Sequence, residues 1–117
     1  VDKDFVSGLR LASLDRYDEA LGHFEKLKFK DLSDGDKFIV LNAYMQAGQE
    51  QKALDLDKGY DKEVINKYLK NGELEKLKEL DTDSKLIDFE IAVLENNYEK
   101  IIELKDTKGL EKDERRA

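Results

Sequence analysis

The chain contains no proline and no cysteine among its 117 residues. Because proline interrupts helices, its absence leaves every segment free to be helical. Without cysteine, neither a disulfide framework nor a thiolate metal site can form, and cysteine usage leaves the redox compartment open. The longest aliphatic or aromatic runs are residues 38–41 and 91–94. They are far shorter than the roughly 18–20 residues that a membrane-spanning helix needs.

The usual signatures of catalysis are also scarce. Glycines are dispersed, which excludes a glycine-rich phosphate loop. The single histidine, His23, borders an apolar stripe, where a half-buried packing or hydrogen-bonding role is favoured over catalysis. Ser33 and Ser84 lack a nucleophile-elbow context and are interpreted as helix caps. We therefore predict that the chain is not an enzyme and has no catalytic residue. A hydrolase that uses His23 with a carboxylate is a disfavoured alternative.

Acidic clusters suggest calcium at first sight. Asp31, Asp34 and Asp36 surround Gly35, but with Gly35 as the sixth position of a calcium loop the first ligand would be Lys30 and the twelfth Leu41. Solvated turns and caps explain these residues better, and neither a histidine pair nor a cysteine cluster exists for zinc. The sequence predicts no metal-ligating and no cofactor-binding residues.

Charge is what the chain has in abundance. Charged residues make up 42% of it, and the net charge is -7. A negative chain repels phosphate backbones and anionic lipid headgroups, which argues against nucleic acid and membrane-surface partners. We therefore expect protein partners and no small-molecule substrate. The length suits one domain, predicted over residues 1–106, and residues 107–117 form a charged tail that we expect to be disordered.

Apolar side chains at helical spacing predict an all-α fold of about eight short helices. Asp15 is expected to cap the second helix, and Ser33 followed by Asp36 resembles a capping box for the third. The third and seventh helices are apolar on more than one side and are expected to be covered twice. The apolar segments lie near residues 5–14, 17–27, 38–47, 53–56, 64–71, 74–80, 86–94 and 98–104.

Four turn-plus-helix segments recur in one register. Their matching positions are separated by 33, 24 and 24 residues, a spacing typical of helix-turn-helix repeats. The matching residues are Ala20, Ala53, Leu77 and Ile101. Four hairpins of this kind predict an irregular, right-handed array similar to tetratricopeptide repeats. Leu77 stands where a small residue is usual, a departure from the regular pattern in the third hairpin.

Four residues are candidates for partner binding. Aromatic residues and methionine are favoured at interface centres, and Phe38, Leu41 and Met45 form a stripe on the third predicted helix. Tyr60 lies between two helices. The alternative is that these side chains fill the core, which is favoured for the stripe and about equally favoured for Tyr60.

One family resemblance extends over nearly all of residues 1–110. It rests on the order of RYDEALGHFEKL (16–27), FIVLNAYMQAGQ (38–49), INKYLKNGELEKLKEL (65–80) and NNYEKIIELKD (96–106), with a hydrophobic helix before the last. This succession resembles the extracytoplasmic C-terminal region of the EssB/YukC family, single-pass membrane components of the type VII secretion system of Gram-positive bacteria.

The resemblance implies a cytoplasmic pseudokinase-like domain and one transmembrane helix before Val1, with this domain on the extracytoplasmic face of the cell membrane. It also implies a dimeric parent protein with a structural role in exporting small helical-hairpin effectors. A chain that begins at Val1 without methionine fits a piece of such a parent. We therefore expect a non-enzymatic assembly domain that contacts other secretion subunits. The alternative is a free cytoplasmic adaptor that binds a peptide in its groove.

Overall fold

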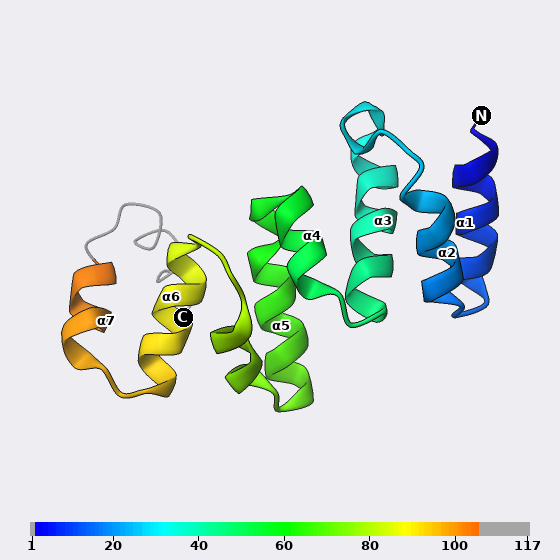
Figure 1. Ribbon diagram of the computed structural model, residues 1–117. Coiled ribbons are helices and arrows are strands. Elements are labelled where there is room, and N and C mark those ends of the chain that lie inside the picture. Colours follow the sequence, from blue (N-terminus) through cyan, green and yellow to red (C-terminus); the bar gives the residue numbers. More distant parts are fainter. Residues whose placement is uncertain (1, 106–117) are drawn as a thin grey trace. The chain divides into compact units, whose positions relative to one another are not determined.

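The computed structural model describes residues 2–105, and this part of the chain contains helices and no strand (Figure 1). The predicted all-α class is confirmed, and the succession of helical hairpins is consistent with the expected tetratricopeptide-like arrangement. The predicted tail, residues 107–117, lies outside the described range. The α-helices of that range are α1 Lys3–Ser13, α2 Tyr17–Phe24, α3 Asp34–Gln46, α4 Glu50–Leu56, α5 Asp61–Asn71, α6 Lys85–Leu94 and α7 Tyr98–Lys105. Its short 3-10 helices are η1 Phe29–Asp31, η2 Lys58–Tyr60 and η3 Leu74–Glu79.

The chain divides into two compact units, residues 1–57 and 58–117. The first contains α1 to α4, and the second contains α5 to α7 with η2 and η3. The single domain expected over residues 1–106 stays a prediction. Each unit is described by itself.

The first hairpin of unit one is closed around a glycine. Gly8 on α1 is buried, and a Cβ atom placed on it would lie 2.4 Å from the ring of Phe24 on α2. The same ring lies 5.8 Å, centroid to centroid, from that of Phe5. Phe24 itself is only 3% exposed, so its ring has little room to move aside. The close approach of α1 and α2 therefore depends on the missing side chain at position 8.

The turn between these helices corrects one prediction. Asp15 does not cap α2. It adopts a left-handed backbone with φ of 60°, and its amide donates to the carbonyl of Ala12, so Asp15 belongs to the end of α1. Its carboxylate accepts a hydrogen bond from the Tyr17 hydroxyl at 3.1 Å. The N-cap of α2 is Arg16, without a side-chain cap.

Helix α3 begins at Asp34, slightly before the position expected from its pattern. Ser33 caps it as predicted, because its hydroxyl accepts the amide of Asp36 at 3.2 Å. The predicted covering on two sides is also found: Val40 and Tyr44 are buried on one face, Leu41 and Met45 on the other, and α3 contacts both α2 and α4. Helix α3 is thus central to unit one.

The second unit contains the largest departure from the sequence analysis. The helix expected over residues 74–80 is the 3-10 helix η3, not an α-helix. It follows α5 across Gly72, whose φ of 69° is the left-handed value expected at this turn. Leu77 on η3 is 0% exposed, like Val64 on α5 and Ile87 on α6. Since η3 contacts both α5 and α6, Leu77 lies at the centre of unit two.

Helix α6 is fastened to α5 through its cap. The Ser84 hydroxyl accepts the amide of Ile87 at 3.1 Å, as predicted for a capping serine. It also donates to the carboxylate of Asp61, at the start of α5, over 2.7 Å. One side chain therefore caps the start of α6 and joins it to α5.

Three of the four residues that match between the repeated segments are buried. Ala20, Ala53 and Leu77 are each 0% exposed. In the last hairpin Ile101 is half-buried, and Leu104 provides the buried contact at 3% exposure. Helix α6, expected to be covered twice, exposes 45% of Val93. The final hairpin, α6 with α7, therefore leaves part of its apolar surface exposed.

Candidate functional site

The four partner-binding candidates are placed differently by the structure. Leu41, Met45 and Tyr60 are 2%, 5% and 5% exposed, so they lie in the core, as the alternative interpretation has it. Phe38, at 52% exposure, presents its ring at the surface of α3. The four residues do not form one exposed patch, and Phe38 is the candidate that a partner could reach directly.

His23 has the hydrogen-bonding role that the sequence favoured. Its Nδ1 lies 3.1 Å from Oδ1 of Asp4, which joins α2 to α1, and both side chains are about one-third exposed. Because the pair holds the two helices of the hairpin together, the contact has a structural use. A histidine and a carboxylate also form part of many hydrolytic sites. The alternative of a hydrolase that uses His23 stays a hypothesis.

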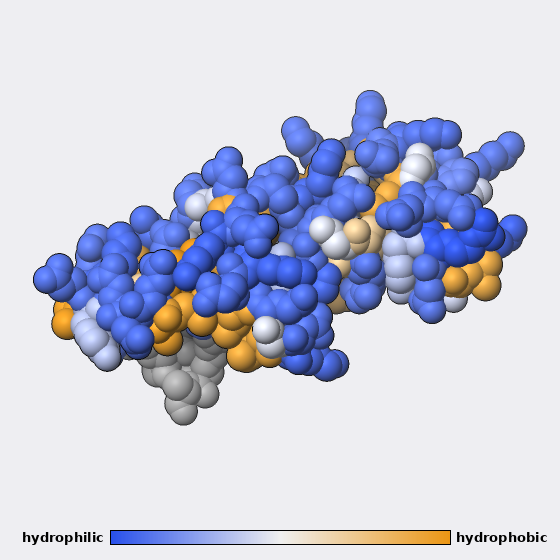
Figure 2. All heavy atoms as spheres, turned by 60° about the horizontal axis from the view of Figure 1, so that its bottom comes forward, coloured by the Kyte–Doolittle hydropathy of each residue, from blue (hydrophilic) through white to orange (hydrophobic). Residues whose placement is uncertain are grey.

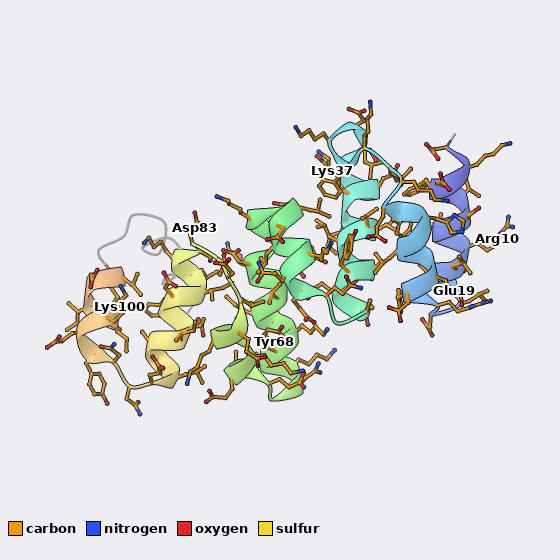
Figure 3. All side chains as sticks on the ribbon, in the orientation of Figure 1. Arg10, Glu19, Lys37, Tyr68, Asp83 and Lys100 are labelled. Atoms are coloured by element: carbon orange, nitrogen blue, oxygen red, sulfur yellow. The ribbon has the colours of Figure 1, made fainter. Side chains whose placement is uncertain are left out.

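Neither a metal cluster nor a membrane span is found within residues 2–105. No three His, Asp or Glu side chains of this range converge closely enough to hold a metal ion. No helix in the range combines the length and the apolar character needed to cross a bilayer. Charged side chains such as Arg10 and Glu19 project outward from their helices (Figure 3). The face seen in Figure 2 is mostly hydrophilic, with hydrophobic patches between the charges.

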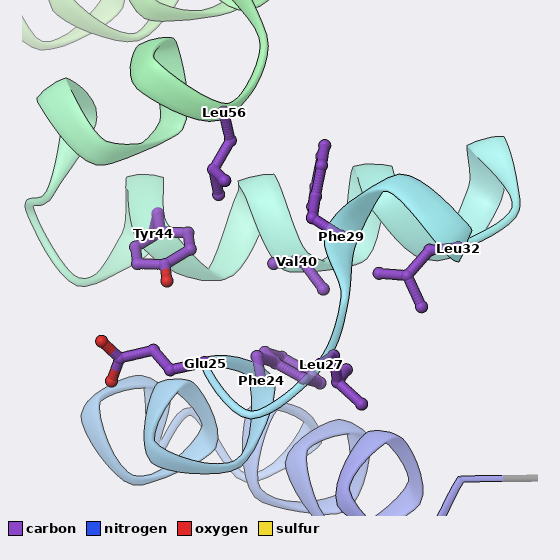
Figure 4. Close-up of a pocket in the computed structure, with 8 residues that line it drawn as sticks. All are labelled: Phe24, Glu25, Leu27, Phe29, Leu32, Val40, Tyr44 and Leu56. Carbon is purple, nitrogen blue, oxygen red and sulfur yellow. The ribbon is translucent and has the colours of Figure 1, made fainter.

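A hollow of about 210 Å³ lies in unit one, between α2, the segment that contains η1, α3 and the end of α4. Figure 4 shows Phe29 and Leu32 on one side of the hollow and Glu25 on the other. Most of its lining is apolar. The residues that line it are Phe24, Glu25, Leu27, Phe29, Leu32, Val40, Tyr44 and Leu56.

The end of the hollow near Tyr44 carries a charge. At one end the Tyr44 hydroxyl points toward the side where Glu25 lies (Figure 4). Burial raises the pKa of Tyr44, and the negative charge of Glu25 raises it further, so the hydroxyl stays protonated and able to donate. The Lys37 ammonium lies 5.7 Å from the centre of the ring of Phe29, one of the lining residues. Glu25 is the charged residue among those that line the hollow, so the end near Tyr44 is acidic.

The size of the hollow limits what it can hold. Pockets for cofactors and drug-sized ligands measure about 300–1,000 Å³, whereas a cavity of about 150 Å³ already accepts a benzene ring. A volume of about 210 Å³ therefore suits one large apolar side chain better than a nucleotide or a cofactor.

The sequence analysis missed this hollow. Its predicted apolar segments end near residue 27 and resume near residue 38, so Phe29 and Leu32 had no predicted place in the core. The available signal was those two apolar residues themselves, three apart in an otherwise charged segment. The structure explains them: η1 holds Phe29 against the hollow, and Leu32 follows as the cap of η1.

Comparison with known proteins assigns the chain to no family. No protein-family model matches the chain, and no curated protein and no solved structure matches it significantly.

Proposed function

We propose that this chain is a non-enzymatic assembly domain of a type VII protein secretion apparatus, the extracytoplasmic part of a single-pass membrane subunit. The observation that carries the proposal is the chain of helical hairpins, which follow one another in the order of the four EssB/YukC-like segments. Hairpin arrays present extended surfaces for other proteins, and this use needs no catalytic group. The parent protein would act as a dimer and contact other secretion subunits.

The exposed apolar residues of the last hairpin support a role in protein contacts. Tyr98 and Ile102 stand one helical turn apart on α7, and their exposed fractions are 70% and 64%. Val93 on the adjacent α6 is 45% exposed. Neighbouring exposed apolar side chains on one helix, such as Tyr98 and Ile102, are favoured at surfaces that bind other proteins.

Deletion tests the proposal directly. In the source bacterium, the codons for residues 2–105 would be removed in frame, and export of small helical-hairpin effectors would be measured in the culture medium. We expect export to stop while the effectors accumulate inside the cell, and re-expression of the intact protein to restore it. Unchanged export by the deletion strain, with the truncated parent present in the membrane, would contradict the proposal.

A free adaptor that binds a peptide is the second candidate, and the hollow in unit one is the observation that favours it. The two functions differ in the sequence that precedes Val1. An apolar stretch of about 20 residues there supports the secretion subunit. A soluble domain or a start codon directly before Val1 supports the adaptor.

A further inference from the structure

The hollow in unit one has a shape and a charge distribution that select a ligand. Its apolar walls come from several separate segments, namely α2, the η1 segment, α3 and α4. Val40 is 3% exposed and Phe24 is 3% exposed, so these side chains are fixed by the core behind them. Leu56, at 40% exposure, lies at the edge, where an incoming group could contact it. Part of the wall is therefore fixed by the core, and Leu56 makes one edge of the opening apolar.

The polar groups of the hollow gather at one end. Glu25 is exposed and lies beside the buried hydroxyl of Tyr44, which can donate a hydrogen bond but is held away from the anionic form. Glu25 is the charged residue among those that line the hollow. A basic group of a bound segment would therefore find its partner at the Tyr44 end, which would orient the segment.

We propose that this hollow binds a segment of a partner protein that inserts one large aliphatic or aromatic side chain and places a lysine or arginine beside Glu25. The inserted side chain fills the space between Val40, Leu32 and Leu56. The basic group pairs with the Glu25 carboxylate, and the Tyr44 hydroxyl donates to a carbonyl of the bound segment. This inference rests on the proposed role of the chain in protein contacts and names the chemistry of one such contact.

The test uses the 117-residue chain with labelled methyl groups, observed by NMR. The probe is a capped hexapeptide, Ala-Gly-Leu-Lys-Gly-Ala, at concentrations up to several millimolar. We expect saturable shifts at the methyls of Leu32, Val40 and Leu56, with a dissociation constant on the order of 1 mM, the range for a contact of this size. Replacing the peptide leucine by serine should weaken binding at least about tenfold.

Charge reversal tests the basic half of the proposal. Glu25→Lys should weaken binding of the lysine peptide about two- to fivefold and strengthen binding of its glutamate counterpart by a similar factor, the range for an exposed ion pair. The control Glu79→Lys makes the same change in net charge at an exposed position of unit two and should leave both affinities unchanged. Circular dichroism of each variant verifies that its helices are retained.

Three outcomes would overturn the inference. They are the absence of shifts at these methyls, equal binding of the lysine and glutamate peptides, and occupation of the hollow by the neutral detergent octyl glucoside where the peptides do not bind. The experiment needs no secretion machinery, so it separates the two proposals. Failed peptide binding with intact crosslinks to secretion subunits removes only this inference, whereas peptide binding with undisturbed export in the deletion strain removes only the proposed function.

Discussion

At the scale of single residues, Gly8 sets the distance between α1 and α2. A methyl group there would meet the Phe24 ring at 2.4 Å, whereas one at Gly22, within α2, would meet no atom within 4 Å. We expect Gly8→Ala to lower the free energy of unfolding by about 1–2 kcal/mol, because overpacking outweighs the gain in helix propensity. Gly22→Ala should raise it by about 0.5–1 kcal/mol. Urea denaturation followed by circular dichroism measures both, and a stabilised Gly8→Ala variant would contradict the packing described.

Ionisation of Tyr60 makes the free energy of unfolding depend on pH in the alkaline range. Burial, together with the charge of Glu63, raises the pKa of its hydroxyl from 10.0 to about 12. Above pH 10 the unfolded chain loses this proton before the folded one does, so the stabilising contribution is complete below pH 10 and is lost as pH rises toward 12. A shift of this size corresponds to roughly 2–3 kcal/mol.

Tyr60→Phe removes this titration. We expect the free energy of unfolding of the variant to fall less steeply between pH 10 and pH 12 than that of the unmodified chain, as measured by urea denaturation at each pH. Parallel slopes for the two proteins would show that Tyr60 is not protected from ionisation.

At the scale of the elements, η3 depends on one large side chain. Leu77 is 0% exposed between α5 and α6, at a register position where the first two hairpins carry alanine. Because Leu77 is fully buried between these elements, Leu77→Ala should leave a cavity and cost about 2–4 kcal/mol. The control Leu69→Ala, at a side chain that is 60% exposed, should cost less than about 0.5 kcal/mol. Equal effects in thermal or urea denaturation would argue against a core centred on Leu77.

A comparison of Ser84 with Ser33 distinguishes the stability gained from helix capping from that gained from a hydrogen bond between helices. Both hydroxyls accept an amide of the first helical turn, but only that of Ser84 is also bonded to Asp61, over 2.7 Å. Ser33→Ala should cost about 1 kcal/mol and Ser84→Ala about 2 kcal/mol. A double-mutant cycle of Ser84→Ala with Asp61→Ala should give a coupling of about 1 kcal/mol. A coupling near zero would mean that the Ser84–Asp61 bond adds nothing to stability in solution.

The helices also show which parts of the fold could be predicted from the sequence. Helical spacing located the α-helices because their apolar residues recur on one or two faces, as Val40 and Leu41 do on α3. The 3-10 character of η3 was missed although Leu74, Leu77 and Leu80 recur every three residues, which is the period of that helix. Asp15 was misassigned because a residue suited to capping the next helix is also suited to a left-handed turn after the previous one.

At the scale of the whole molecule, burial decided between the interpretations of the candidate site. The spacing of Leu41 and Met45 alone does not say whether they are buried or exposed. When a helix is apolar on two faces, the second face either packs against another element or is exposed to solvent. Contacts between distant segments settle that choice, and they also create the hollow. No local pattern places Phe29 beside Leu56, 27 positions later.

Crosslinking of the full-length parent protein in intact membranes, read out by mass spectrometry, tests the proposed function most directly. The lysines of the described range, such as Lys37 and Lys100, are placed at the surface and can react (Figure 3). We predict crosslinks from these lysines to a second copy of the parent and to other subunits of the secretion apparatus. Crosslinks confined to cytoplasmic proteins, with none to a membrane subunit of that apparatus, would contradict the account.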